Sequence, residues 1–193
     1  MQSELIKKKY ELAKSTPSDI NEHIDTLYNL ANECSHITEM GVRNVVSTWA
    51  FMLRNPETLV GIDIHTNFNV DEAQFAYPKW KFIKGDTTKI KIEETELLFI
   101  DTLHIYSQLK KELVLHANQV KKYIVLHDTT TYGYVDEPTS WQTPEIMENY
   151  KVEEKKGLQP AIIEFLNDNP EWILFKEYTN NNGLTILKRK QNG

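Results

Sequence analysis

The sequence predicts an α/β fold with a doubly wound, mostly parallel sheet, and three observations support this. Short apolar runs alternate with segments that carry apolar residues at helical spacing. The chain closes with two strand-like runs around Asn182-Gly183, a dipeptide typical of the turn between antiparallel strands. Five earlier runs end on a carboxylate, as expected where buried strands leave the core: Glu39, Asp63, Asp86, Asp101 and Asp128.

Helical segments lie before and between these strands. Residues 3–14 and 19–33 have helical spacing and predict two leading helices outside the sheet. After the first strand, the apolar positions of 42–53 share one face and predict a crossover helix. Residues 105–119 predict another amphipathic helix, and the strand at 123–126 follows it directly. With the C-terminal hairpin, the sheet should have seven strands.

The length and the apolar content indicate one domain. The chain has 193 residues, of which 40% are hydrophobic and 26% charged. This is enough to bury a substantial core. We expect a single domain over 1–193, with leading helices in 1–35 and the sheet core in 36–189. Residues 129–157 hold a long run of turn residues, and loops of this length are usually functional. We predict that they form a lid or substrate loop.

Charge and cysteine content narrow the class of partner. The formal net charge of -6 argues against a nucleic-acid or anionic-membrane surface and favours a small neutral or cationic ligand. Cys34 is the only cysteine, so no intramolecular disulfide can form, which suits a reducing cytosol. No stretch approaches the ~20 apolar residues of a membrane span, and the first residues lack a signal-peptide core. We expect a soluble cytoplasmic protein, with oligomeric state left open.

The first strand-turn-helix segment suggests a nucleoside site. Glu39 ends the strand, and Gly41 allows the backbone and the helix that follows to approach a ligand. Asp63 ends the next strand, where nucleotide-binding α/β proteins place an acid for the ribose hydroxyls. Asp86 follows at the end of a third strand. The turn reads GVRNVV rather than G-x-G-x-x-G, which favours a mononucleoside and makes an NAD enzyme the weakest alternative.

The order of EMG, GID, GDT and FID at strand ends, with the terminal hairpin, resembles the class I S-adenosylmethionine-dependent methyltransferases over roughly 36–189. DTLHIY at 101–106 and HD at 127–128 resemble the metal-dependent macrolide-sugar O-methyltransferases and the cephalosporin-hydroxylase-like proteins. The resemblance implies a Rossmann-like fold and S-adenosylmethionine as cofactor. The implied cofactor contacts are Glu39, Gly41 and Ser47 at the methionine part, Asp63 at the ribose, Asp86 and Thr87 at the adenine, and also Asp101.

Two further acids predict a cation site without reference to any family. If Asp101 and Asp128 end adjacent strands, the strand spacing of ~4.8 Å brings both carboxylates within reach of one ion. Mg²⁺ suits two carboxylates and is our first expectation. His127 would complete the set of ligands, and its nitrogen would favour Mn²⁺, Fe²⁺ or Zn²⁺ instead. His104 follows Asp101 by three residues and is predicted to overhang the cation as a general base.

Together with this cation site, the resemblance implies methyl transfer to a hydroxyl of a small molecule or sugar. Three aromatic residues of the long loop, Tyr132, Tyr134 and Trp141, are predicted to stack on the acceptor, and the alternative is that they pin the loop or form a dimer contact. Tyr106, two residues after His104, is grouped with them and is predicted to pack near His104 and orient it. Two other functions stay open: a metal-dependent hydrolase that uses the Asp and His cluster, and a cofactor-binding module without catalytic activity.

Overall fold

The computed structural model describes residues 2–138, 140, 143–147 and 153–190. It contains one seven-stranded sheet in the order β3-β2-β1-β4-β5-β7-β6. β1 to β5 are parallel, and β7 is antiparallel to both of its neighbours. The strands are β1 (His36–Met40), β2 (Thr58–Asp63), β3 (Trp80–Lys84), β4 (Thr95–Ile100), β5 (Val120–His127), β6 (Trp172–Tyr178) and β7 (Leu184–Arg189). The predicted mostly parallel sheet with a C-terminal hairpin is confirmed.

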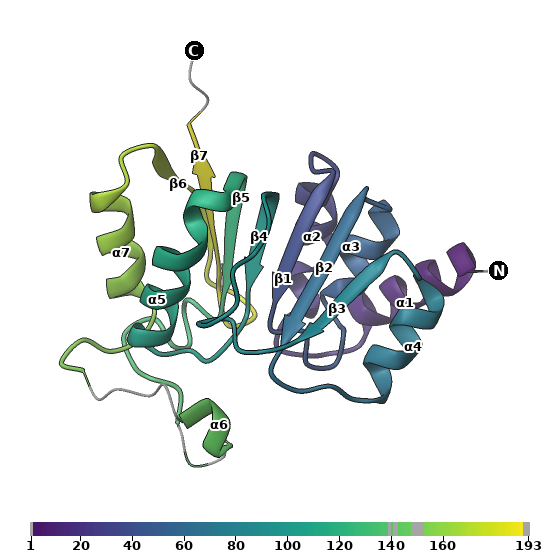
Figure 1. Cartoon of the computed structure of the whole chain (residues 1–193), viewed down its shortest axis with the longest axis horizontal. Helices are drawn as coiled ribbons and strands as arrows, with labels where there is room; N and C mark the ends of the chain where they lie inside the picture. Colours follow the sequence, from purple (N-terminus) through teal and green to yellow (C-terminus); the bar gives the residue numbers. More distant parts are fainter. Residues whose placement is uncertain (1, 139, 141–142, 148–152, 191–193) are drawn as a thin grey trace.

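Helices cover both faces of this sheet (Figure 1). The helices are α1 (Gln2–Ser15), α2 (Ile24–Ala31), α3 (Thr48–Arg54), α4 (Phe68–Ala76), α5 (Tyr106–His116), α6 (Pro144–Met147) and α7 (Gln159–Asp168), with short 3₁₀ turns η1 (Asn21–His23) and η2 (Ala117–Gln119). α1 to α4 share one apolar core with the sheet, and α5 and α7 share the other. Among the described residues, no helix is long and apolar enough to cross a membrane.

β4 shows why the strands read as continuous apolar runs. Leu97 and Phe99 pack into the core on the α1 to α4 side, whereas Leu98 and Ile100 pack into the core on the α5 side. Side chains alternate along a strand, so a strand covered on both faces needs apolar residues at every position. The first residue after the strand does not have to be apolar, and after β4 this residue is Asp101.

The first crossover helix is shorter than the sequence pattern predicts. α3 begins at Thr48, not at residue 42, and a loop occupies 42–47. The prediction fails because Arg43 and Val45 have φ angles of 44° and 66°, which are incompatible with a right-handed helix. Val45 is still fully buried, so the apolar spacing reports burial of this loop and not helical structure.

Gly41 lies where β1 passes closest to the end of β4. Its φ angle is 84°, and an added Cβ would lie 1.9 Å from the carbonyl oxygen of Asp101. We therefore expect Gly41→Ala to lower the free energy of unfolding by more than about 2 kcal/mol, measured by chemical denaturation. Gly85→Ala is the control, because the closest atom that its Cβ would meet is the flexible end of Ile90. Equal losses in the two variants would contradict this explanation.

Candidate active site

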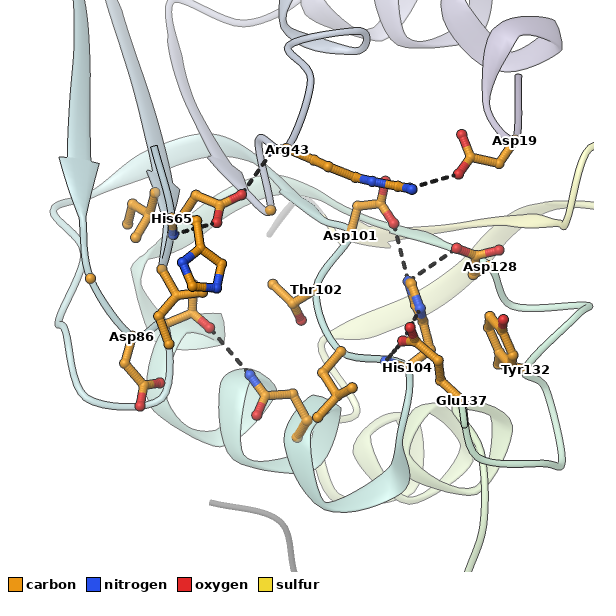
Figure 2. Close-up of a pocket in the computed structure, with 18 of the residues that line it drawn as sticks. Asp19, Arg43, His65, Asp86, Asp101, Thr102, His104, Asp128, Tyr132 and Glu137 are labelled. Carbon is orange, nitrogen blue, oxygen red and sulfur yellow. Dashed lines mark hydrogen bonds and ion pairs between the residues drawn. The ribbon is translucent and has the colours of Figure 1, made fainter. Parts of the chain in front are cut away.

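A cavity of about 530 Å³ opens at the carboxyl ends of the parallel strands, next to the neighbours β1 and β4 where the strand order reverses (Figure 2). Open α/β sheets bind ligands in this position. Eight of the residues predicted from the sequence line it: Gly41, Asp63, Asp86, Thr87, Asp101, His104, Asp128 and Tyr132. The structure therefore brings four of the five strand-end acids to a single site. The fifth, Glu39, is not among the lining residues.

Asp63 and Asp86 line one half of the cavity and also organise the backbone around it. Asp63 Oδ2 accepts hydrogen bonds of 2.8 Å from the amides of both Val42 and Arg43. Asp86 Oδ1 accepts a 2.8 Å bond from the amide of Thr88. These carboxylates therefore shape the loops after β1 and β3, and their roles at the ribose and adenine stay predictions.

Glu39 lies beneath the cavity. Its side chain is fully buried and accepts hydrogen bonds from the hydroxyls of Ser47 and Thr48 at the start of α3, the latter at 2.7 Å. Burial raises the pKa of Glu39 to about 8, although both hydroxyls oppose the shift. Glu39 and Ser47 thus attach the loop after β1 to the sheet, and their predicted contact with the methionine moiety stays a prediction.

The raised pKa of Glu39 makes stability depend on pH. In the unfolded chain a glutamate ionises near pH ~4.3, whereas in the folded protein Glu39 ionises near pH 8. Between these values the folded state binds the extra proton, so the free energy of unfolding falls as pH rises. We expect Glu39→Gln to remove up to about 1.4 kcal/mol per pH unit of this decline. Denaturation of both proteins between pH 5 and pH 8.5 checks it, and identical slopes would contradict it.

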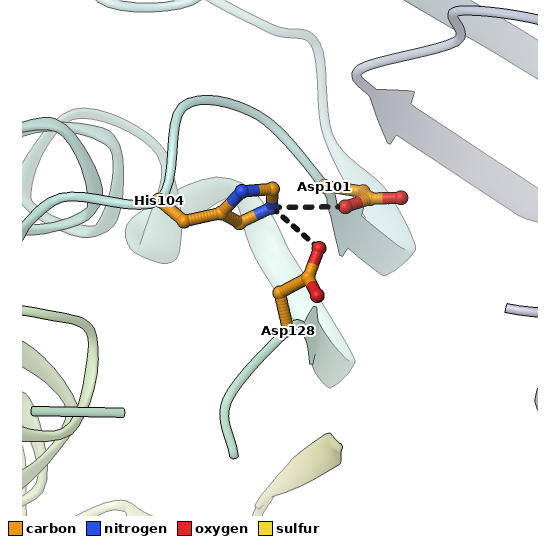
Figure 3. Close-up of side chains that lie close together, drawn as sticks. All are labelled: Asp101, His104 and Asp128. Atoms are coloured by element: carbon orange, nitrogen blue, oxygen red, sulfur yellow. Dashed lines mark hydrogen bonds and ion pairs between the residues drawn. The ribbon is translucent and has the colours of Figure 1, made fainter. Parts of the chain in front are cut away.

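Asp101, His104 and Asp128 form a compact cluster in the other half of the cavity (Figure 3). His104 Nε2 lies 3.1 Å from Asp101 Oδ1 and 3.1 Å from Asp128 Oδ2. The three donor atoms all lie within 4.8 Å of one another, close enough for one divalent cation to bind the two carboxylates beside the histidine. Asp128 Oδ1 is buried and has no hydrogen-bond partner among the described residues. The donor set and its spacing fit a cation site.

His127 approaches the same two carboxylates from the sheet side. Its side chain is 1% exposed, and Nδ1 lies 3.2 Å from Asp101 Oδ1 and 3.4 Å from Asp128 Oδ2. Nε2 faces the backbone oxygens of Asp19, at 3.1 Å, and Asn181, at 3.3 Å. Because carbonyl oxygens only accept, Nε2 carries a hydrogen, and the lone pair of the neutral ring is on Nδ1. This nitrogen needs a proton or a metal ion between it and the carboxylates.

The nitrogen of His104 that faces away from the cluster is also held by a hydrogen-bond partner. Its Nδ1 lies 2.8 Å from Glu137 Oε2, and its ring stacks on Tyr132 with centroids 5.2 Å apart. An outer N–H held by a carboxylate or by backbone carbonyls is typical of histidines at metal sites. Both histidines therefore direct their inner nitrogens at Asp101 and Asp128.

The charges of this cluster control its protonation. Burial alone lowers the pKa of His104, but its hydrogen bonds to Asp101 and Glu137 and the nearby carboxylate charges raise it to about 10. His127 follows the same pattern, and its pKa lies well above the ordinary range. Burial alone would raise the pKa of Asp101, but the charge of His127 and the hydrogen bond from His104 lower it. Without a metal ion, both histidines are therefore cations at neutral pH, and His104 cannot accept a proton.

Two other predicted site residues lie away from the cavity, and a third is outside the described residues. The Tyr106 hydroxyl donates a 2.7 Å hydrogen bond to Glu164 of α7, and the residue does not line the cavity. Tyr134 is 69% exposed and is also absent from the lining. Trp141 lies outside the described residues. Of the three predicted aromatics that the structure describes, only Tyr132 lines this cavity.

The structure adds residues that sequence reasoning missed. Asp19 and Arg43 line the cavity mouth, where Arg43 Nη1 lies 3.0 Å from Asp19 Oδ2. Glu137 and Asn182 line it from the long loop and the hairpin turn. Figure 2 shows Asp19 and Glu137 approaching the cluster from separate segments. No local pattern marks these residues, because their proximity arises only when distant segments pack together.

Comparison of the sequence with protein-family models and with curated proteins gives no match. Comparison with solved structures gives many. A Staphylococcus aureus protein named as a caffeoyl-CoA O-methyltransferase is 15% identical, with a TM-score of 0.63 and coverage of 97% of this chain and 91% of that one. The SAH-bound Podospora anserina methyltransferase PaMTH1 is 14% identical, with a TM-score of 0.58 and coverage of 96% and 88%.

The N-methyltransferase NodS from Bradyrhizobium japonicum, in complex with S-adenosyl-L-homocysteine, is 10% identical, with a TM-score of 0.62 and coverage of 98% and 99%. At these identities, the similarity establishes a shared fold. The chain has the Rossmann-like fold found in these methyltransferases, and the resemblance predicted from its strand ends is confirmed at the level of the fold. A shared fold does not establish the reaction, which depends on the chemistry of the site.

Proposed function

We propose that this protein transfers a methyl group from S-adenosylmethionine to a hydroxyl of a small molecule or sugar, with the help of a divalent cation. The observation that carries the proposal is a single cavity with two different halves. One half presents Asp63 and Asp86 at strand ends, and the other presents the cluster of Asp101, His104 and Asp128. A nucleoside and an ion would therefore lie side by side at the carboxyl edge of the sheet.

The acidic lining supports a cationic cofactor. Among the described residues, the cavity lining contains one arginine, Arg43, and no lysine. Six carboxylates also line it: Asp19, Asp63, Asp86, Asp101, Asp128 and Glu137. A sulfonium carries a positive charge, which such a lining stabilises. The fold agrees, because the structures of PaMTH1 and NodS that share it are complexes with the demethylated cofactor.

The cation would be held by Asp101, Asp128 and His127. The two carboxylates suit Mg²⁺, but a nitrogen ligand shifts the preference toward Mn²⁺ or Fe²⁺. We therefore propose a first-row transition ion in place of our first expectation of Mg²⁺. When bound, a divalent cation lowers the pKa of a hydroxyl that coordinates it.

His104 is the proposed general base. Its Nε2 lies 3.1 Å from both carboxylate oxygens, so it would face a hydroxyl bound to an ion that these carboxylates hold. With an ion bound to these carboxylates, the charges that raise the pKa of His104 would be offset, and its Nε2 would be free to accept a proton. Glu137 keeps the ring oriented through Nδ1, and Tyr132 covers its face. Tyr132 also offers an aromatic surface on which a sugar or aromatic acceptor would stack.

Calorimetry tests this proposal in one set of titrations. S-adenosylhomocysteine is titrated into the protein alone and with Mn²⁺, and Mn²⁺ and Mg²⁺ are titrated separately in buffers of different ionisation enthalpy. We expect cofactor binding, preferred binding of Mn²⁺, and release of protons on ion binding, because the ion and the histidine protons compete. Ion binding without cofactor binding would favour a metal-dependent hydrolase. Cofactor binding without methyl transfer to any hydroxylated sugar or catechol would indicate an inactive binding module.

A further inference from the structure

A second fully buried carboxylate lies beneath the cavity, between the loop after β3 and the loop after β4. Glu112 of α5 has no exposed surface. It accepts hydrogen bonds from Thr87 Oγ1 at 2.5 Å, from Thr102 Oγ1 at 2.9 Å and from Gln108 Nε2 at 2.8 Å. All three donors line the cavity and come from three separate segments. One carboxylate thus holds together the floor of the cavity beside Asp86.

This arrangement determines which polar groups the floor can offer to a ligand. An ionised carboxylate only accepts, so the hydroxyl hydrogens of Thr87 and Thr102 are both used by Glu112. The amide nitrogen of Gln108 is also used, by Glu112 and by Thr87 Oγ1 at 3.3 Å. Oxygen lone pairs remain on all three side chains. These three side chains therefore offer acceptors to a ligand and no free donor hydrogen.

We propose that Glu112 is a positioning residue that sets the hydrogen-bond polarity of the nucleobase end of the cavity. An adenine amino group donates, whereas the oxo group of hypoxanthine at the same position accepts. An acceptor-rich floor pairs with the amino group and leaves an oxo group facing other lone pairs. The site then selects adenosyl over inosyl cofactors. This inference rests on the proposed function, which places a nucleoside in this half of the cavity.

Paired ligands test the proposal directly. The affinities of S-adenosylhomocysteine and S-inosylhomocysteine are compared by calorimetry at pH 8.5, because burial raises the pKa of Glu112 to about 7 and the acid must be ionised. We expect the wild type to bind the adenosyl ligand about 100-fold more tightly. Glu112→Gln places an amide donor among the three donors, so a hydroxyl must turn its hydrogen away. We expect this variant to reduce the ratio to below about 10-fold.

The chain offers a matched control in Glu39. It is also fully buried and bound to two hydroxyls, but it lies under the loop after β1. Glu39→Gln should change the affinities of the two ligands by the same factor and so keep the wild-type ratio, because the predicted contact of Glu39 is with the amino-acid part that both ligands share. Thr102→Val is a second test variant in case Glu112→Gln fails to fold, as judged by thermal melting. It removes one oriented acceptor and should lower the ratio as well.

The outcomes separate this proposal from the proposed function. Binding of S-adenosylhomocysteine by the wild type without discrimination against the inosyl ligand would overturn the role of Glu112 alone. An unchanged ratio in both Glu112→Gln and Thr102→Val, or an equal loss in Glu39→Gln, would do the same. If the wild type binds neither ligand, the proposed function is wrong and this inference fails with it.

Discussion

His104→Ala is expected to lower methyl-transfer turnover by about 10²–10⁴-fold while the affinity for S-adenosylhomocysteine stays within about threefold. The loss follows because the His104 imidazole, with Nε2 3.1 Å from both carboxylates, is the proposed acceptor of the hydroxyl proton. Cofactor affinity persists because Asp63 and Asp86 lie in the other half of the cavity. Turnover is measured on the acceptor found in a screen of hydroxylated sugars and catechols.

His36→Ala is the matched control for this variant. His36 starts β1, and its ring lies 4.0 Å from Glu57 with 44% of its side chain exposed. Its loss should leave turnover unchanged. Near-normal turnover in His104→Ala would refute the role of base. The Mn²⁺ affinity of His104→Ala adds a second result, because a base leaves it nearly intact whereas a ligand does not.

Asp101→Asn should lower Mn²⁺ affinity by more than about 100-fold. Substituting a residue that only hydrogen-bonds to a metal ligand typically lowers the affinity by about 10- to 100-fold. Asp101 Oδ1 is the atom that both histidines approach, at 3.1 Å and 3.2 Å, so the substitution removes a charge from the centre of the cluster. Turnover should fall in parallel. Titration of Mn²⁺ followed by electron paramagnetic resonance measures the affinity without an acceptor.

Asp19→Asn tests whether any acid near the cavity has this effect. The Asp19 carboxylate faces Arg43, and only its backbone oxygen contacts His127, so the cluster keeps all of its side chains. We expect the Mn²⁺ affinity of this variant to match the wild type. An equal loss in the two variants would mean that the ion responds to the overall charge of the cavity and not to coordination by Asp101.

The sequence pattern by itself determined where the strands end and where the C-terminal hairpin turns. An apolar run covered on both faces must end where the chain reaches water, so Asp63, Asp101 and Asp128 could be located at strand ends from the sequence alone. Parallel pairing then places such ends at one edge of the sheet. Asn182-Gly183 similarly predicted the hairpin, because both residues adopt positive φ angles, 70° and 98°, in its turn.

Tertiary structure alone decided how these residues are used. Glu39 follows the same sequence pattern as the other acids, yet the hydroxyls of α3 bind it beneath the cavity. His104 and His127 direct their inner nitrogens at the carboxylates because Glu137 and a backbone oxygen of the hairpin turn hold their outer nitrogens. A periodic pattern reports only whether a position is buried. The hydrogen-bond partner of a buried polar group depends on segments far away in the chain, and only the folded structure brings them together.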